Sequence, residues 1–341
     1  MWRCDNLGGL GEHVTCNSAY CSACPKGRCS VHCCTCFTPP SCDRRAPRLR
    51  LRMYADDCQV YLSTSVEDVP LAVSKFAAYV VDINAWLSAC RIRLNAAKTQ
   101  LLWLGSSQLV DRVDYHDVPV LGTRVAISDT ARDLGVVIDR ELSLAAHVTA
   151  VCRSGYNQLL QLRPVVRSLS VNATKTLVQA FISCRLDYCN SLLFGISDGL
   201  LRRLQSVQNA AARLVTGARR CDHITPVLRQ LHWLPVRQRV VFKIAGIGHQ
   251  SLVRAAPAYL ADDFRLLSDV CCRPLRSNSN DTRKLLVPRT HNKLGDTSFS
   301  AAGPRLWNDL PAAGTYLRLL ETFSENSSIW RPKRLVTPLN V

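Results

Sequence analysis

The chain has 341 residues, a length that suits two average domains or one large domain with appendages. Its hydrophobic content of 47% is ordinary for a globular protein, and no run of about 18 uncharged apolar residues predicts a membrane span. Lys and Arg number 43 against 26 Asp and Glu, and the resulting charge of +17 favours polyanionic partners, either nucleic acid or an anionic membrane surface.

Residues 1–48 are predicted to form an unstructured, Cys-rich leader, because they show neither helical nor strand periodicity. Nine of the 17 cysteines lie within residues 1–50. No secretory signal is evident, so we expect reduced thiols in a cytoplasmic or nuclear protein that is not secreted. The run CSACPKGRCSVHCCTC leaves zinc binding open, although its spacing is too crowded to predict a recognisable finger.

The stretch LRMYADDCQVYL (51–62) predicts a β-hairpin with Asp56 and Asp57 at its tip, because apolar and polar residues alternate on both sides. The simplest interpretation is a solvated turn, in which Asp is a favoured residue. The alternative is a metal site, since adjacent carboxylates repel each other and a divalent cation offsets that repulsion. A two-metal site would need at least one further carboxylate from a neighbouring strand.

A helix is predicted from Ser65, which is placed to cap it together with Asp68. Its core-facing stripe consists of Val69, Val73, Phe76, Val80, Ile83 and Leu87. The sequence LNAAKTQLLWLG (94–105) then predicts a turn before a buried strand, with Asn95 and Lys98 in the turn. Lys98 is either a general acid toward a pyrophosphate leaving group, a point charge toward phosphate, or an ordinary loop lysine.

Strand-like runs follow at 118–127 and 134–139, and helical patterns cover 143–163, 173–188 and 199–216. Gly217 is expected to end the last of these helices, and two more helices are expected within 224–254, the second opened by Pro235. Tyr188 and Cys189 are expected in the core, as are His223, His232 and Trp233, whereas Asp187 and Asn190 receive no assigned role. The fold class is therefore α+β.

The segment 199–220 is an amphipathic helix with basic ends. Its expected buried stripe is Leu200, Leu204, Val207, Ala211 and Leu214. Its basic side chains are Arg202, Arg203, Arg213, Arg219 and Arg220. Such arginines either form a solvated surface or contact nucleic-acid phosphates, and the net charge of the chain favours the second interpretation.

Together these motifs resemble the reverse transcriptase of non-LTR (LINE-type) retrotransposons, in particular the CR1/L2-like group. The resemblance covers about residues 50–325 and rests on motifs in this order: YADDCQVYL (54–62), INAWLSACRIRLN (83–95), KTQLLWLG (98–105), ARDLGVVIDRELSLAAHV (131–148), RLDYCNSLLFG (185–195), LQSVQNAAARLVTG (204–217), HITPVLRQLHWLPVRQRVVFKI (223–244) and SFSAAGPRLWNDLP (298–311).

The resemblance implies a partial palm at 49–140, a helical thumb and connection-like region at 141–265, and a basic, irregular tail at 266–341. Asp56 and Asp57 would be catalytic and would bind Mg²⁺ or Mn²⁺, Lys98 would act on phosphate or as general acid, and LGVVID would be the primer-grip region. The implied partners are an RNA template and a DNA primer or RNA–DNA duplex, with no membrane.

The chain departs from the family before the hairpin. The family has an earlier strand with a catalytic Asp and a later Gln-Gly turn, and residues 1–50 contain neither feature. We therefore expect a fragment of an RNA-directed DNA polymerase that is inactive as a lone chain, with an unpaired edge on the hairpin. The alternative is a non-enzymatic RNA- or DNA-binding remnant that uses its basic helices.

Overall fold

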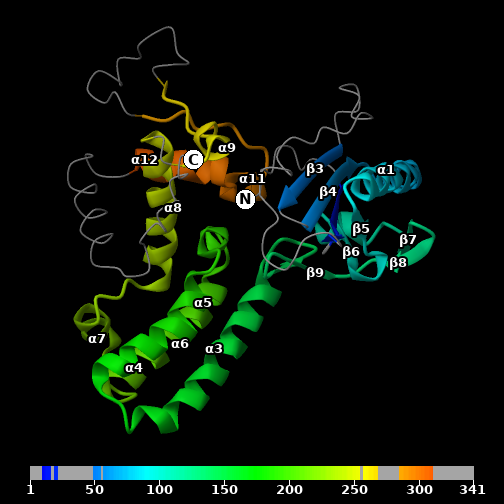
Figure 1. Ribbon diagram of the computed structural model, residues 1–341. Coiled ribbons are helices and arrows are strands. Elements are labelled where there is room, and N and C mark those ends of the chain that lie inside the picture. Colours follow the sequence, from blue (N-terminus) through cyan, green and yellow to red (C-terminus); the bar gives the residue numbers. More distant parts are fainter. Residues whose placement is uncertain are drawn as a thin grey trace, which may run out of the picture. The chain divides into compact units, whose positions relative to one another are not determined.

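A computed structural model describes residues 10–16, 19–21, 49–54, 57–253, 256–267 and 284–309 of the chain. These residues form an α+β protein with small antiparallel sheets (Figure 1). They divide into two compact units, of which the first ends at His147 and the second begins at Val148.

The first unit is built on a four-stranded antiparallel sheet in the order β3-β4-β1-β6. The predicted hairpin is formed by β3 (Leu49–Tyr54) and β4 (Asp57–Thr64), with Tyr54 paired to Asp57. The other edge of β4 pairs with β1 (Leu10–Cys16), which also pairs with β6 (Thr99–Leu104).

Strand β1 comes from the segment that was expected to be unstructured, and a second short strand of that segment, β2 (Ala19–Cys21), pairs with β5 (Ile92–Leu94). The expectation of an unpaired hairpin edge is therefore corrected at β4, because β1 satisfies its backbone hydrogen bonds. The remaining residues of 1–48, including most of the cysteines and the possible zinc ligands among them, lie outside the described residues.

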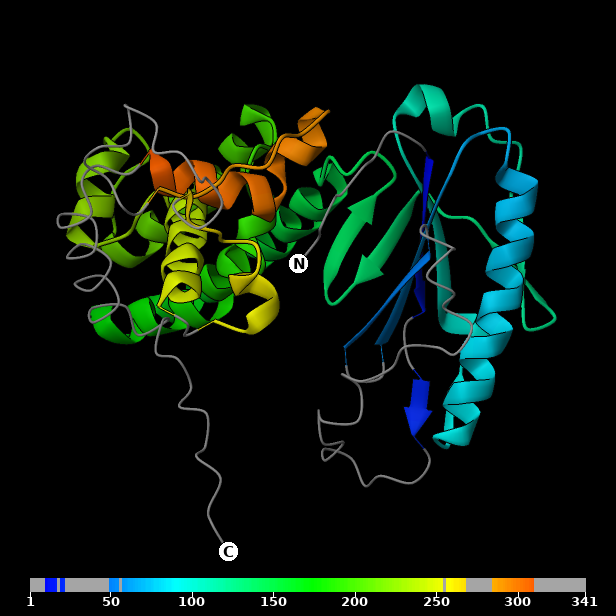
Figure 2. The same ribbon diagram turned by 90° about the horizontal axis from the view of Figure 1, so that it is seen from above.

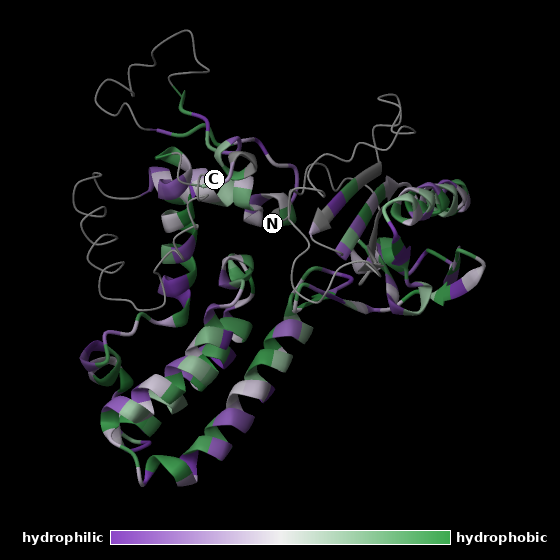
Figure 3. Ribbon diagram, in the orientation of Figure 1, coloured by the Kyte–Doolittle hydropathy of each residue, from purple (hydrophilic) through white to green (hydrophobic). Residues whose placement is uncertain are grey.

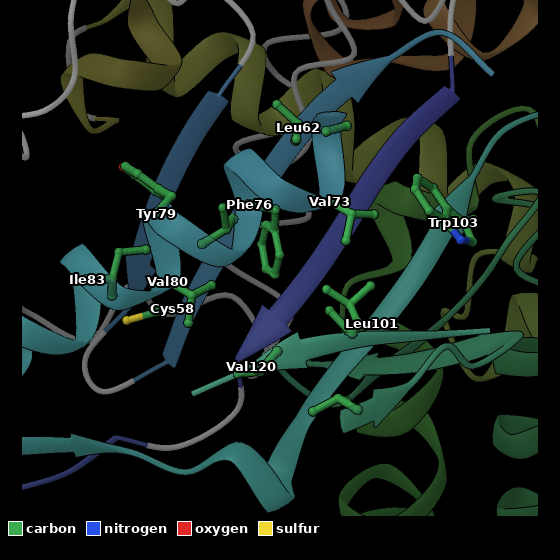
Figure 4. Close-up of a cluster of buried hydrophobic side chains, with 14 of the residues drawn as sticks. Cys58, Leu62, Val73, Phe76, Tyr79, Val80, Ile83, Leu101, Trp103 and Val120 are labelled. Atoms are coloured by element: carbon green, nitrogen blue, oxygen red, sulfur yellow. The ribbon is translucent and has the colours of Figure 1, made fainter. Parts of the chain in front are cut away.

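Helix α1 (Val69–Ala89) covers one face of this sheet (Figure 2). All six residues of the predicted stripe are buried, and their side chains meet those of β4, β6 and β7 in one apolar cluster (Figure 4). The helix begins four residues later than predicted, because Ser65 donates its hydroxyl to the carboxylate of Asp68 at 2.8 Å and Pro70 lies in the first turn.

Two small hairpins replace the two predicted strand-like runs. They are β7 (Asp117–Val120) with β8 (Thr123–Ala126), and β9 (Thr130–Asp133) with β10 (Val136–Asp139). The turns are Leu121–Gly122 and Leu134–Gly135, and all four residues have positive φ, as a two-residue type I′ turn requires. The β9–β10 hairpin lies on the opposite side of the sheet from α1 (Figure 2).

The second unit is helical. Its elements, counting the first turn of α3, are α3 (Ala145–Val166), α4 (Val171–Val178), a π-helical turn (Gln179–Ser183), α5 (Cys184–Asp187), a 3₁₀ turn (Asn190–Leu193), α6 (Asp198–Thr216), α7 (Ile224–Gln230), α8 (Val236–Leu252), α9 (Ala258–Ala261), α11 (Lys293–Thr297) and α12 (Phe299–Asn308). Hydrophilic and hydrophobic residues alternate along α3, as expected of an amphipathic helix (Figure 3). The predicted roles of Gly217 and Pro235 are confirmed, since they follow α6 and precede α8.

Helix α6 packs with its apolar stripe inward, in a register that differs from the prediction at both ends. Leu200 and Leu214 are only partly buried. The buried residues are Leu201, Leu204, Val207, Gln208, Ala211, Ala212 and Val215. Val207 packs against α3 at Gly155, where an added Cβ would lie 2.7 Å from Val207 Cγ1.

The last described helices form part of this core, where the sequence predicted an irregular tail. The small residues of SFSAAGPRLWN belong to α12, which packs against α8. The ring of Phe264 leaves no room for a side chain at two glycine positions. A Cβ at Gly303 would lie 2.6 Å from this ring, and one at Gly248 would lie 3.0 Å from it. These motifs therefore stabilise the second unit through close packing.

The substitution Gly155→Ala is expected to destabilise the second unit. The new methyl group overlaps Val207, and overpacking of this kind typically costs about 1–2 kcal/mol beyond the helix-propensity gain. Chemical denaturation followed by circular dichroism measures the effect. The matched control is Gly199→Ala in α6, where a Cβ meets nothing within 4 Å, so equal destabilisation by both variants would contradict the packing argument.

Candidate functional site

Strand β4 presents one apolar and one polar face. Cys58, Val60 and Leu62 are buried toward α1, whereas Asp57, Gln59 and Tyr61 alternate with them and are partly exposed. We call this second side the polar face of the sheet. The residues of β3 that pair with these three positions lie on the same side of the sheet, because directly opposed residues share a face. Asp57 is partly exposed on this polar face.

The structure brings Asp57 and Lys98 to the same end of the sheet. Cys16 of β1 pairs with both Cys58 and Thr99, so these three residues form one row across β4, β1 and β6. Asp57 and Lys98 directly precede the two outer residues of this row. Their backbones are two strand spacings apart, or about 10 Å. Asp56, the other predicted catalytic residue, lies outside the described residues.

The predicted turn before β6 is confirmed as a short 3₁₀ helix, η2 (Ala96–Lys98). Asn95 caps it by accepting a hydrogen bond from the backbone N–H of Ala97 at 3.0 Å. The hydroxyl of Thr99 donates to the carbonyl of Asn95 at 3.1 Å. These two bonds fix the turn and leave the side chain of Lys98 exposed at the end of the sheet.

A buried carboxylate that sequence reasoning missed lies against the polar face. Asp133, at the end of β9, is 7% exposed and accepts a hydrogen bond from the side-chain amide of Gln59. The hydroxyl of Tyr61 donates to the other side of that amide, at 2.6 Å from Oε1. Burial raises the pKa of Asp133, the bond from Gln59 opposes this shift, and the charge of Asp57 adds to it.

Three of the predicted nucleic-acid-binding arginines lie in α6, and Arg219 and Arg220 lie in the loop that follows it. Those of α6 make contacts within their own unit. Arg203 donates to the hydroxyl of Thr149 at 3.2 Å. Arg213 donates to the backbone carbonyls of Arg219 and Asp222, at 3.2 and 3.4 Å, and so holds the loop that follows α6. Arg202, Arg203, Arg219 and Arg220 are exposed.

A second basic surface begins at α3. Residues 142–186 contain no acidic residue. Their basic residues other than histidine are Arg153, Arg163, Arg167, Lys175 and Arg185, and all of these except the partly buried Lys175 are exposed. The exposed large apolar side chains of this segment include Tyr156, Leu160 and Phe181, at 42%, 66% and 43%. We call these eight residues the α3 surface.

Asp187 has a structural partner in α8. Its carboxylate forms a two-fold ion pair with Arg239, and both side chains are less than a fifth exposed. The amide of Asn190 donates to the same carboxylate at 3.4 Å. Burial lowers the pKa of the nearby Lys243, and the charge of Asp187 opposes that shift. The polar residues of RLDYCN therefore attach this loop to α8.

Some of the predicted core residues of the second unit are not buried. Tyr188 is 51% exposed, and His223 and His232 are both exposed. Tyr188 follows directly after α5 and His223 directly before α7, where the chain turns at the surface. The described residues contain no group of three or more His, Cys, Asp or Glu that would hold a metal ion. None of their helices is long and apolar enough to cross a membrane.

These observations define an α+β protein with a carboxylate and a lysine at one end of a sheet and a basic helical unit. No protein-family model and no solved structure matches the chain. Among curated proteins, it is similar to the "Probable RNA-directed DNA polymerase from transposon X-element" of Drosophila melanogaster, with 26% identity over 173 residues. The match covers 49% of this chain and 18% of that protein. The similarity supports a relationship to reverse transcriptases.

We expect Asp187→Ala to lower the free energy of unfolding by about 2–4 kcal/mol, because it leaves the largely buried charge of Arg239 without its partner. Urea denaturation of the full chain measures this effect. Asp198→Ala is the matched control. Asp198 pairs with Arg237, which lies in α8 like Arg239, but both side chains of this pair are more than half exposed. That variant is expected to cost about 1 kcal/mol or less, and similar losses in both variants would contradict the argument.

Proposed function

We propose that the chain is the carboxy-terminal half of the reverse transcriptase domain of a non-LTR, CR1/L2-like retrotransposon. Two observations support this proposal: the similarity to a transposon RNA-directed DNA polymerase and the ordered series of motifs along the chain. The geometry that carries it is the pairing of β4 and β6 on the two edges of β1, which brings Asp57 and Lys98 to the same end of the sheet.

The residues at the end of the sheet that carries Asp57 and Lys98 provide some of the groups that nucleotidyl transfer needs, but not a third carboxylate. Carboxylate oxygens are the ligands that Mg²⁺ prefers, so Asp56 and Asp57 would hold the cation, with Mn²⁺ as the alternative. Bound metal would polarise the phosphoryl oxygens and activate the attacking hydroxyl. Lys98, two strand spacings or about 10 Å away with β1 between, would face the negative charge of the departing pyrophosphate.

The strand beside the hairpin does not supply a third carboxylate to this end. Strand β1 contains one acidic residue, Glu12, which pairs with Leu62 of β4 and Trp103 of β6. Leu62 is five residues along β4 from Asp57, a separation of about 17 Å. We therefore propose that this chain alone is inactive as a polymerase, although it retains part of the metal site.

Primer extension on an RNA template tests this proposal. With Mg²⁺ or Mn²⁺, we expect the chain to incorporate no more nucleotide than the double variant Asp56→Ala, Asp57→Ala, because two carboxylates hold the catalytic cations poorly. Incorporation by the chain that the double variant abolishes would contradict the proposed inactivity. It would also establish the two aspartates as catalytic residues.

The second candidate function is binding of nucleic acid without catalysis, and the α3 surface favours it. Its basic residues have no acidic neighbour in the sequence, and its exposed Tyr156 and Phe181 provide rings on which bases can stack. Arg213 of α6, by contrast, is bonded to the loop of its own unit. We therefore propose the α3 surface as the main site that binds an RNA–DNA duplex or single-stranded RNA, with the exposed arginines of segment 199–220 contributing less to binding.

Salt titration of duplex binding, followed by fluorescence anisotropy, separates the two sets of arginines. Replacing Arg153, Arg163 and Arg167 with Gln is expected to reduce the slope of log affinity against log salt by about 3, because roughly one counterion is released per phosphate contact. The matched control replaces Arg202, Arg219 and Arg220 with Gln and removes the same charge. Equal reductions would show that overall charge, rather than the α3 surface, determines binding.

A further inference from the structure

Helix α3 carries a stripe of side chains along one edge of the face that packs into the second unit. The residues of the stripe follow one another at spacings of four and three positions, which places them on one side of an α-helix. They are Thr149, Arg153, Tyr156, Leu160 and Arg163. The residue directly before each of them is buried: Val148, Cys152, Gly155, Leu159 and Leu162. We call the first set of five residues the Tyr156 stripe.

Two arginines of other helices reach α3 from different sides. Arg203 of α6 donates to the hydroxyl of Thr149 at 3.2 Å, so its charge lies at one end of the Tyr156 stripe. Arg185 of α5 donates to the hydroxyl of Ser154 at 2.8 Å. Ser154 precedes Tyr156 by two residues and therefore lies about 160° away around the helix. The α3 surface thus has two sides, and the stripe is the side that holds Tyr156 between arginines.

The middle of the stripe is apolar and its ends are basic. Tyr156 and Leu160 are 42% and 66% exposed and lie one helical turn apart. Arg153 and Arg163 flank them at a separation of ten residues, or about 15 Å. A duplex hides the faces of its bases and presents phosphates and sugars, which gain little from an apolar surface. A single strand can place a base on an aromatic ring while its phosphates reach the flanking arginines.

The charges around the stripe favour a polyanion. Residues 142–186 contain no acidic residue. Helix α6 contains one, Asp198, and this carboxylate pairs with Arg237 of α8. The arginines of the stripe are therefore not matched by carboxylates of their own helix, and phosphate groups supply the charge that complements them.

We propose that the Tyr156 stripe binds single-stranded nucleic acid, with a base stacked on Tyr156 and the phosphates on either side held by Arg153 and Arg163. This inference rests on the second proposed function, binding of nucleic acid at the α3 surface. It selects an unpaired strand over a duplex as the ligand of this side of α3.

Fluorescence anisotropy with two labelled ligands, a single-stranded oligouridylate and a blunt RNA–DNA duplex of the same length, tests this inference. Tyr156→Leu removes the ring but keeps an apolar side chain. We expect it to weaken single-strand binding by about tenfold and duplex binding by less than about twofold. Tyr156→Phe keeps the ring and is expected to bind both ligands as the unaltered chain does. Tyr188→Leu is the matched control, because Tyr188 is 51% exposed and lies outside the stripe.

An oligonucleotide with abasic sugars in place of the bases separates stacking from an effect on folding. Tyr156→Leu and the unaltered chain are expected to bind this ligand equally, since it offers no base to stack. A loss that persists on the abasic ligand, or that is as large for the duplex, would overturn the inference.

The salt titration distinguishes failure of this inference from failure of the proposed function. If Tyr156→Leu binds oligouridylate normally while the arginine replacements in α3 still reduce the salt slope, the stacking site is wrong and binding at the α3 surface stands. If the unaltered chain shows no salt-dependent binding to either ligand, both are overturned.

Discussion

The first unit depends on one strand, β1, which is paired on both of its edges. β4 and β6 do not pair with each other, and the row through Cys16 connects them. Without β1, the inner edges of both strands would expose unpaired N–H and C=O groups beside a buried core, at a cost comparable to many lost hydrogen bonds. Part of the Cys-rich segment is therefore a structural component of the sheet that carries Asp57.

The position of β1 also determines what the sheet end can contain. β4 and β6 are both antiparallel to β1, so they run in the same direction, and α1 provides the long connection that such a pair needs. The starts of the two strands then lie at one end of the sheet, which is why Asp57 and Lys98 come together although they are 41 residues apart. A hairpin connection could not have produced this arrangement, because it would have placed the two residues at opposite ends.

The sequence predicted most accurately those elements whose signal is local. The six-residue stripe of α1 and the role of Gly217 follow from helical periodicity and from the conformational freedom of glycine, and both are confirmed. The two Leu-Gly turns were missed because Leu is unfavourable at positive φ. The β7–β8 hairpin was therefore taken for a single strand, and the run at 134–139 covered only the second turn and β10. The pairing of β1 and the contact between Gln59 and Asp133 join distant segments, and no local pattern indicates either of them.

Among the described residues, each unit has a largely buried carboxylate that joins two distant segments, Asp133 with Gln59 and Asp187 with Arg239. Apolar packing leaves freedom at such junctions, because a strand shifted by two residues still presents the same kind of face to the core. Only one alignment places a carboxylate opposite its amide or guanidinium, and misalignment would leave a buried charge without a partner. The apolar faces therefore hold the hairpin on the sheet, while the polar pair determines where along β4 its turn lies relative to Asp57.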